Sequence, residues 1–163
     1  TDSGGELDID STPNQGTEVR LILPAETKVA VTDGTDDVKP LVSVDRSSVR
    51  VLLAEDHPLL RPMLLEAMTV AGFDVRATSS AEEALRMDQD WRASVLVLDV
   101  NLPGATGDMV AESIRTRRAQ NVPVIFITGN NEFEMPDWPN VELLRKPFGL
   151  SDLMESIDRH ARG

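Results

Sequence analysis

The chain has 163 residues, 40% of them hydrophobic, and a formal net charge of −12. This length accommodates one ordinary domain plus an appendage. The acidity argues against a nucleic-acid-binding surface, which would carry a basic patch, and against adhesion to anionic membranes. Because the chain has no cysteine, disulfides and thiolate metal sites are excluded.

The first 48 residues differ in composition from the rest. Residues 1–48 carry four basic and ten acidic side chains, whereas residues 49–163 carry twelve and eighteen. The first part is therefore the more acidic per residue, and it is rich in Thr, Asp, Gly and Ser. We place a domain boundary between Pro40 and Val49 and predict a linker over residues 25–48, with a short possible strand at Leu41–Val44.

A β-hairpin is predicted at the start of the chain. Residues 6–10 and 17–23 alternate apolar with polar side chains, and the turn-forming segment STPNQG separates them. The stretch GGELDIDSTPNQGTEVRLILP resembles the last two strands of a histidine-kinase ATP-binding domain, so residues 1–24 are interpreted as a remnant of one. The parts that hold nucleotide would lie upstream, and no ATP binding is predicted. The alternative is a flexible acidic arm.

From Val49 onward, short apolar runs alternate with amphipathic segments. The runs predict buried strands at residues 49–54, 74–78, 95–99, 123–129 and 141–145. A first helix follows Pro58 and ends near Gly72, and Ser80 with Glu83 forms a capping-box signature for a second. Helical spacing of apolar residues predicts two more, over residues 109–119 and 150–161.

The segment NNEFEMPDWPN, between the fourth and fifth of these strands, is the exception. Pro136 and Pro139 forbid a long helix there, so at best one or two turns are expected around Asn131–Met135. The alternation as a whole predicts an α/β fold, a doubly wound parallel sheet of five strands covered on both faces by helices.

Four of the five predicted strands end in a charged or reactive group. These are Glu55-Asp56, Asp99, Thr128 and Lys146. Parallel strands bring such groups to one edge of the sheet, where ligands collect. Three carboxylates favour a hard, oxygen-ligated cation such as Mg²⁺, a hydroxyl and an ammonium can hold phosphoryl oxygens, and the central carboxylate, Asp99, is the candidate nucleophile.

Residues 49–163 resemble a response-regulator receiver domain of the CheY-like, flavodoxin-like type. The resemblance rests on VLLAEDHP, VLVLDVNLPGATG, VIFITG and LLRKPF in that order. It implies strand order 2-1-3-4-5 and a cis bond between Lys146 and Pro147. It further implies that Asp99 accepts a phosphoryl group from phosphohistidine, with Thr128 and Lys146 holding its oxygens. The implied Mg²⁺ ligands are Glu55, Asp56, Asp99 and the backbone carbonyl of Asn101.

Two features depart from the family pattern. Receivers usually place Tyr or Phe three residues before the lysine, where this chain has Leu143. The span from Thr128 to Lys146 is also shorter than usual by about one helical turn, or about 5 Å of helix. The signalling surface around the fourth helix is therefore expected to differ, while the phosphorylation chemistry is expected to survive.

The two resemblances together predict the C-terminal part of a hybrid sensor histidine kinase, in the cytoplasm, whose catalytic core lies outside this sequence. The receiver itself would be a phosphoacceptor rather than a conventional enzyme. Its partner would be a phosphohistidine domain in cis or a histidine phosphotransfer protein, and no DNA-binding effector is expected after Gly149.

Three alternatives stay open. The chain could be a stand-alone single-domain regulator that binds proteins when phosphorylated, or a receiver that binds proteins without being phosphorylated. The third is an aspartyl-phosphate hydrolase, which would want an Asp two residues after Asp99, where Asn101 stands.

Overall fold

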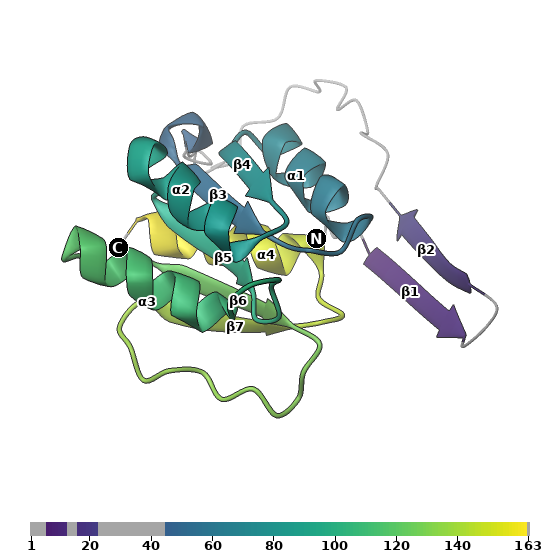
Figure 1. Cartoon of the computed structure of the whole chain (residues 1–163). Coiled ribbons are helices and arrows are strands. Elements are labelled where there is room, and N and C mark those ends of the chain that lie inside the picture. Colours follow the sequence, from purple (N-terminus) through teal and green to yellow (C-terminus); the bar gives the residue numbers. More distant parts are fainter. Residues whose placement is uncertain (1–5, 13–15, 23–44, 163) are drawn as a thin grey trace, which may run out of the picture.

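The computed structural model describes residues 6–12, 16–22 and 45–162 (Figure 1). Its main body is a five-stranded parallel sheet in the order β4-β3-β5-β6-β7, which is the predicted order 2-1-3-4-5. The strands are β3 (Arg50–Ala54), β4 (Asp74–Thr78), β5 (Val95–Asp99), β6 (Val124–Thr128) and β7 (Val141–Arg145). The helices are α1 (Leu60–Val70), α2 (Ala81–Trp91), α3 (Gly107–Arg118) and α4 (Leu150–Ala161). The predicted α/β doubly wound, CheY-like fold is confirmed.

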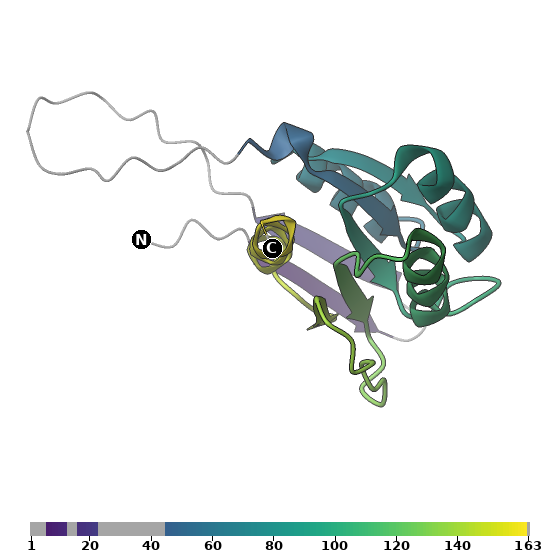
Figure 2. The ribbon, with the colours of Figure 1, turned by 90° about the vertical axis from the view of Figure 1, so that its left-hand side faces the viewer.

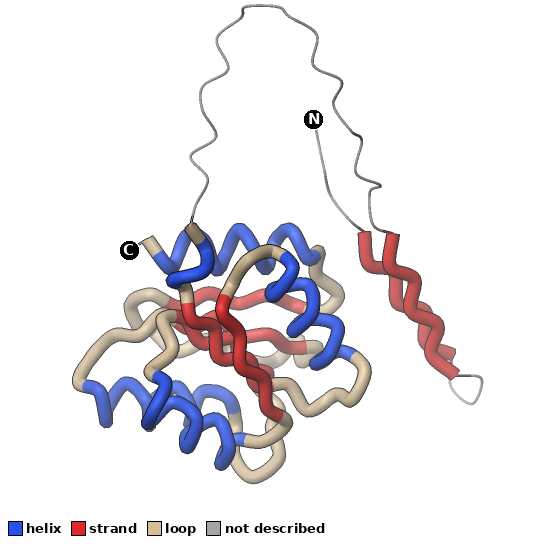
Figure 3. Tube along the Cα trace, turned by 90° about the horizontal axis from the view of Figure 1, so that it is seen from above, coloured by secondary structure: helices blue, strands red, loops and turns tan. Residues whose placement is uncertain are grey.

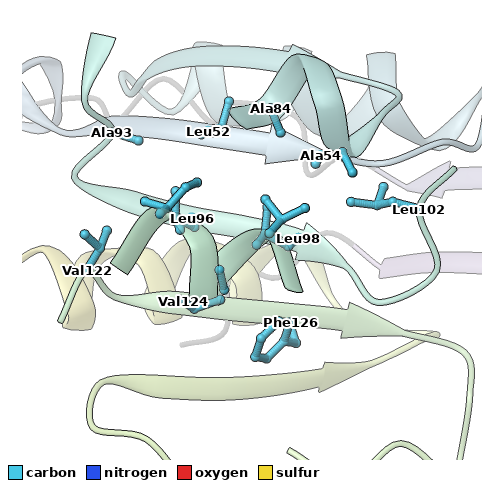
Figure 4. Close-up of a cluster of buried hydrophobic side chains, with 14 of the residues drawn as sticks. Leu52, Ala54, Ala84, Ala93, Leu96, Leu98, Leu102, Val122, Val124 and Phe126 are labelled. Atoms are coloured by element: carbon cyan, nitrogen blue, oxygen red, sulfur yellow. The ribbon is translucent and has the colours of Figure 1, made fainter. Parts of the chain in front are cut away.

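Helices cover both faces of this sheet (Figure 3). Leu52, Leu96 and Phe126 point to the face covered by α2 and α3, and Figure 4 shows this cluster. The intervening strand residues point to the other face, where Leu64 of α1 and Leu153 of α4 pack. Figure 2 views α4 end-on, across the sheet from α2 and α3. Because both faces are buried, the strands are continuously apolar instead of alternating.

No regular helix forms between β6 and β7, which agrees with the expectation of at best one or two turns around Asn131–Met135. Residues 129–140 run as an open loop (Figure 1) with a single turn at residues 131–132. Pro136 and Pro139 lack backbone N–H donors, and the segment has no apolar stripe to bury as a helix. The loop is nevertheless held in place, because the Phe133 ring packs edge-on against Phe126 with a centroid separation of 5.5 Å.

The signals for helix ends have mixed outcomes. Gly72 follows α1 with a φ of +98°, a conformation that glycine adopts without strain. Ser80 caps α2 by accepting a hydrogen bond from the Glu83 backbone N–H at 3.4 Å. Glu83 does not complete the capping box, because its carboxylate accepts a hydrogen bond from the Thr78 hydroxyl instead.

Two structured segments precede β3. Strands β1 (Glu6–Thr12) and β2 (Gly16–Ile22) pair antiparallel, which confirms the hairpin, whereas its origin in a kinase domain stays a prediction. The possible strand at Leu41–Val44 lies outside the described residues.

The 3₁₀ helix η1 (Arg46–Ser48) follows. Arg46 of η1 lies 5.1 Å from the centroid of the Phe73 ring. It also forms a two-armed ion pair with Asp158 of α4, at 3.0 Å from Nε to Oδ1 and 2.5 Å from Nη2 to Oδ2. Its Nη1 donates to the Ala71 carbonyl at 3.3 Å. Contacts with the receiver domain therefore begin at Arg46, inside the segment predicted as a linker.

Candidate functional site

Three carboxylates meet at the carboxyl edge of the sheet. Glu55 directly follows β3, Asp99 ends the neighbouring β5, and Asp56 lies next to Glu55. One carboxylate oxygen from each lies within 4.8 Å of the others. Glu55 is fully buried and Asp99 is 5% exposed, whereas Asp56 is exposed. The strand register thus delivers two buried carboxylates and one solvent-facing carboxylate to the same point.

Lys146 joins the two buried carboxylates. Its Nζ lies 2.8 Å from Glu55 Oε2 and 2.6 Å from Asp99 Oδ2. The residue directly follows β7, and its backbone N–H donates to the Thr128 carbonyl at 2.8 Å. The Lys146–Pro147 bond is cis, as predicted from the resemblance. Glu55 and Asp99, which lie 91 and 47 positions before Lys146 in the sequence, therefore share one ammonium group.

Burial and charge act in opposite directions on these groups. Burial raises the pKa of Glu55 and the Asp99 charge adds to this, while Lys146 opposes it. Burial alone would lower the pKa of Lys146, but its hydrogen bonds to Asp99 and Glu55 and their charges outweigh that effect and raise it. The ammonium is thus fixed in its charged form, and the cluster keeps an excess of negative charge.

The loop after β5 fixes the orientation of Asp99. The backbone N–H of Asn101 donates to Asp99 Oδ1 at 2.8 Å, and Asn101 forms an isolated β-bridge with Thr106. Gly107 then passes so close that a Cβ on it would lie 2.3 Å from the Asp99 carbonyl oxygen. No side chain fits there without displacing backbone, so only glycine suits this position.

Thr128 ends β6, the strand next to β5 on the side away from β3. Asp99 pairs with Ile127 in the register, so Thr128 lies one residue further toward the site. It is fully buried, and its Oγ1 accepts a hydrogen bond from the Asn130 N–H at 3.0 Å. The hydroxyl therefore connects the end of the strand to the loop of residues 129–140.

The donors at this edge suit a hard divalent cation. Three carboxylates within 4.8 Å of one another supply only oxygen, and a cation would offset the negative charge that Lys146 leaves uncompensated. Mg²⁺ prefers one or two carboxylates and several waters, and the exposed Asp56 leaves one side open to solvent. The residues present fit Mg²⁺.

Two neighbours of the site were not found by sequence reasoning. Arg61 Nη1 donates to the Glu55 carbonyl at 3.1 Å. His57 is exposed and caps the start of α1, since its Nδ1 accepts from the N–H groups of Leu59 and Leu60 at 3.3 and 3.2 Å. A cation in the first turn of a helix opposes the helix dipole, and this was the available signal for Arg61.

Comparison with known proteins identifies the family. The model of the response regulator receiver domain matches residues 51–158, the segment that contains the sheet edge described above. This chain belongs to the response-regulator receiver family. Receiver domains are parts of two-component systems, and both response regulators and sensor kinases occur among the relatives.

The relatives differ in what surrounds their receivers. Response regulator protein FleR of Pseudomonas aeruginosa is 32% identical over 120 residues, 71% of this chain and 25% of FleR. Sensor protein EvgS of Escherichia coli K12 is 27% identical over 128 residues, 77% of this chain and 10% of EvgS. The receiver therefore spans a quarter or less of these relatives' lengths.

Solved receiver structures agree over almost their whole length. A response regulator receiver protein from Sinorhizobium medicae has a TM-score of 0.65 and 28% identity, covering 71% of this chain and 95% of that one. The receiver domain of the hybrid histidine kinase CckA has a TM-score of 0.60 and 25% identity, covering 69% and 98%.

Proposed function

We propose that this receiver takes a phosphoryl group from a phosphohistidine onto Asp99. The observation that carries the proposal is the double contact of Lys146 with Glu55 and Asp99. A buried carboxylate held beside an ammonium and two further carboxylates is arranged to gain a phosphoryl group and to have its new negative charge balanced.

The transfer can be written so that atoms and charge balance. A carboxylate oxygen of Asp99 attacks phosphorus, the bond from phosphorus to the imidazole nitrogen breaks, and that nitrogen leaves as imidazole after gaining a proton. Lys146 and Thr128 hold the transferred oxygens by charge-assisted and hydroxyl hydrogen bonds. Glu55, Asp56, Asp99 and the Asn101 carbonyl would hold Mg²⁺, which, when bound, neutralises charge on the phosphoryl oxygens.

The experiment tests Asp99 by direct phosphorylation. With a small phosphodonor such as acetyl phosphate and Mg²⁺, the chain should gain one phosphoryl group by mass spectrometry, and Asp99→Asn should gain none. Asp90→Asn, which removes an exposed carboxylate on α2, is the matched control and should label like the parent chain. Equal labelling of Asp99→Asn would refute the assignment.

The wider context we infer is the C-terminal end of a hybrid sensor kinase working in the cytoplasm. The phosphoryl group would come from the kinase's own histidine or be exchanged with a histidine phosphotransfer protein. In the described part of the chain no helix combines the length and hydropathy needed to cross a membrane. The hairpin over β1 and β2 supports a kinase remnant, and sensor proteins among the relatives support this context.

A stand-alone regulator is the second candidate, and the similarity to FleR favours it. Whether an ATP-binding domain precedes Thr1 in the full-length protein separates the two. An ATP-binding domain ending in this hairpin is the outcome expected for the hybrid kinase. Any other upstream sequence would favour the regulator, and neither outcome changes the assignment of Asp99.

A further inference from the structure

The amino edge of the sheet, opposite the candidate phosphorylation site, gathers four arginines. Arg50 begins β3, Arg92 follows α2, and Arg117 and Arg118 end α3. In Figure 4 this amino edge is on the left, where Ala93 and Val122 lie at the tails of the strand arrows. In a chain with a formal net charge of −12, this local excess of positive charge needs a physical reason.

These arginines surround two adjoining hollows. Arg50, Arg92 and Arg118 line one of about 570 Å³, together with the polar side chains of Ser94, Gln120 and Asn121. A second hollow of about 320 Å³ shares Arg92 and Arg118 and adds Arg117. Both volumes lie in the range of small-molecule sites.

A single carboxylate lies among the residues that line the two hollows. It belongs to Asp88, whose side chain is fully buried and turned toward the protein. Its Oδ2 accepts from Arg117 Nη2 at 2.7 Å and from Arg118 Nε at 3.0 Å, and its Oδ1 accepts from the Ala93 N–H at 3.2 Å. Asp88 offsets one of the four positive charges, and an excess of three remains.

Three of the arginines also have a structural role along α2 and just after it. Arg50 Nη1 donates to the Trp91 carbonyl at 2.5 Å, Arg117 Nη1 to the Leu85 carbonyl at 3.3 Å, and Arg118 Nη1 to the Ala93 carbonyl at 2.8 Å. Cations are favourable at a helix C-terminus, so this role explains their presence. It does not explain Arg92.

Arg92 is exposed and lines both hollows. Within the described residues its side chain forms neither an ion pair nor a hydrogen bond, and its φ of +52° is a conformation that glycine or asparagine adopts more readily. Burial lowers the pKa of Arg118, and the Arg92 and Arg117 charges lower it further against the opposing effect of Asp88. The arginines therefore repel one another, and a bound anion would relieve this repulsion.

We propose that the larger hollow binds a small phosphate-bearing anion. Guanidinium groups match phosphate oxygens with two parallel hydrogen bonds. Arg50 at the start of β3 and Arg92 after α2 are exposed and can offer such donors here. Arg118, whose nitrogens are held by Asp88 and by the Ala93 carbonyl, adds positive charge behind them. Inorganic polyphosphate and nucleoside phosphates share this chemistry. The site lies at the opposite edge of the sheet from Asp99 and does not depend on phosphorylation.

The test is a titration of the full chain with inorganic phosphate, pyrophosphate and ADP, followed by amide NMR shifts. EDTA is present, because without a divalent cation the carboxylate cluster repels phosphate. Pyrophosphate should bind with a millimolar or lower Kd and shift residues 92–94 and 120–122, leaving 55–57 and 99–101 in place. Added salt should weaken binding, and Asp99→Asn should bind equally well.

A charge-matched pair of variants gives the decisive comparison. Arg92→Gln should weaken pyrophosphate binding about tenfold, whereas Arg86→Gln, which removes the same charge from an exposed side chain on α2, should leave it unchanged. Equal affinity for pyrophosphate and ADP assigns recognition to the phosphate groups, and tighter ADP binding adds nucleoside contacts; both support the proposal. No binding at millimolar ligand, equal weakening by both variants, or tighter binding of an acidic peptide would overturn it.

Discussion

At the scale of single residues, Lys146 governs the candidate site. Its one positive charge is shared by Glu55 and Asp99 at 2.8 and 2.6 Å. The third carboxylate of the cluster, Asp56, is not paired with this ammonium. Three carboxylates against one ammonium leave like charges crowded at the edge of the sheet. The folded state carries this repulsion and the unfolded state does not, so a cation that binds the folded cluster should stabilise the protein.

Mg²⁺ should therefore raise the melting temperature. At a hundred times its Kd, one bound ion adds about 2.7 kcal/mol to the free energy of unfolding. Asp56→Ala should blunt the response, and Asp90→Ala, an exposed carboxylate elsewhere, should preserve it. Melting curves by calorimetry with and without millimolar Mg²⁺ measure both effects. A parent chain that melts identically in both conditions would argue against the metal site.

Replacing Gly107 by even the smallest side chain should lower the stability of the protein. A Cβ there would lie 2.3 Å from the Asp99 carbonyl oxygen, so Gly107→Ala should cost about 1–3 kcal/mol of stability and slow phosphorylation by displacing Asp99. Gly129→Ala is the matched control, because a Cβ at Gly129 meets nothing within 4 Å. Urea denaturation compares the two, and a neutral Gly107→Ala would show that the approach is not tight.

At the scale of elements, the open loop of residues 129–140 is where we expect this receiver to depart from the family pattern. Thr128 Oγ1 accepts the Asn130 N–H. Arg145 Nη1 donates to the Asn130 carbonyl at 2.8 Å, and Trp138 lies 5.2 Å below the Arg115 guanidinium. Leu143 has no ring that could swing between buried and exposed positions. The loop is thus connected to the site through the Thr128 hydroxyl.

Phosphorylation, or a beryllofluoride mimic, should reduce amide hydrogen exchange in residues 129–140 more than in α4. The physical reason is that the Thr128 hydroxyl turns toward the phosphoryl group and the loop settles around it. Thr128→Ala should still label at Asp99 but lose the change in the loop. If protection rose chiefly in Leu150–Ala161, the loop would not be the switch.

Much of this architecture could be predicted from the sequence, for a physical reason. Strands buried on both faces appear as unbroken apolar runs, and parallel strands place their final residues at one edge, so the grouping of Glu55, Asp99 and Lys146 was foreseeable. Contacts made by long side chains with distant backbone were not. Nothing in the sequence says which carbonyl Arg61 or Arg145 will reach, because such bonds depend on packing and not on periodicity.

At the scale of the whole molecule, the sheet has two electrically opposite edges. Carboxylates gather where the strands end, and arginines gather where they begin. The formal net charge of −12 conceals this division, because a sum over the chain carries no information about position. The negative net charge therefore disfavours anionic ligands for the molecule as a whole and not for its amino edge.

The ion pair between Arg46 and Asp158 has a consequence for how this module is exchanged between proteins. Composition alone would place the start of the receiver at Val49. A receiver domain that begins there lacks the ion pair and the contact of Arg46 with Phe73. A chain starting at Asp45 should be more stable by about 1 kcal/mol and melt about 4 °C higher. Asp158→Asn, which removes the ion pair and leaves the contact of Arg46 with Phe73, should reduce the difference in melting temperature. The segment that recombination can move intact between kinases and regulators then begins before β3, and its first residues are bound to α4 by the Arg46–Asp158 ion pair.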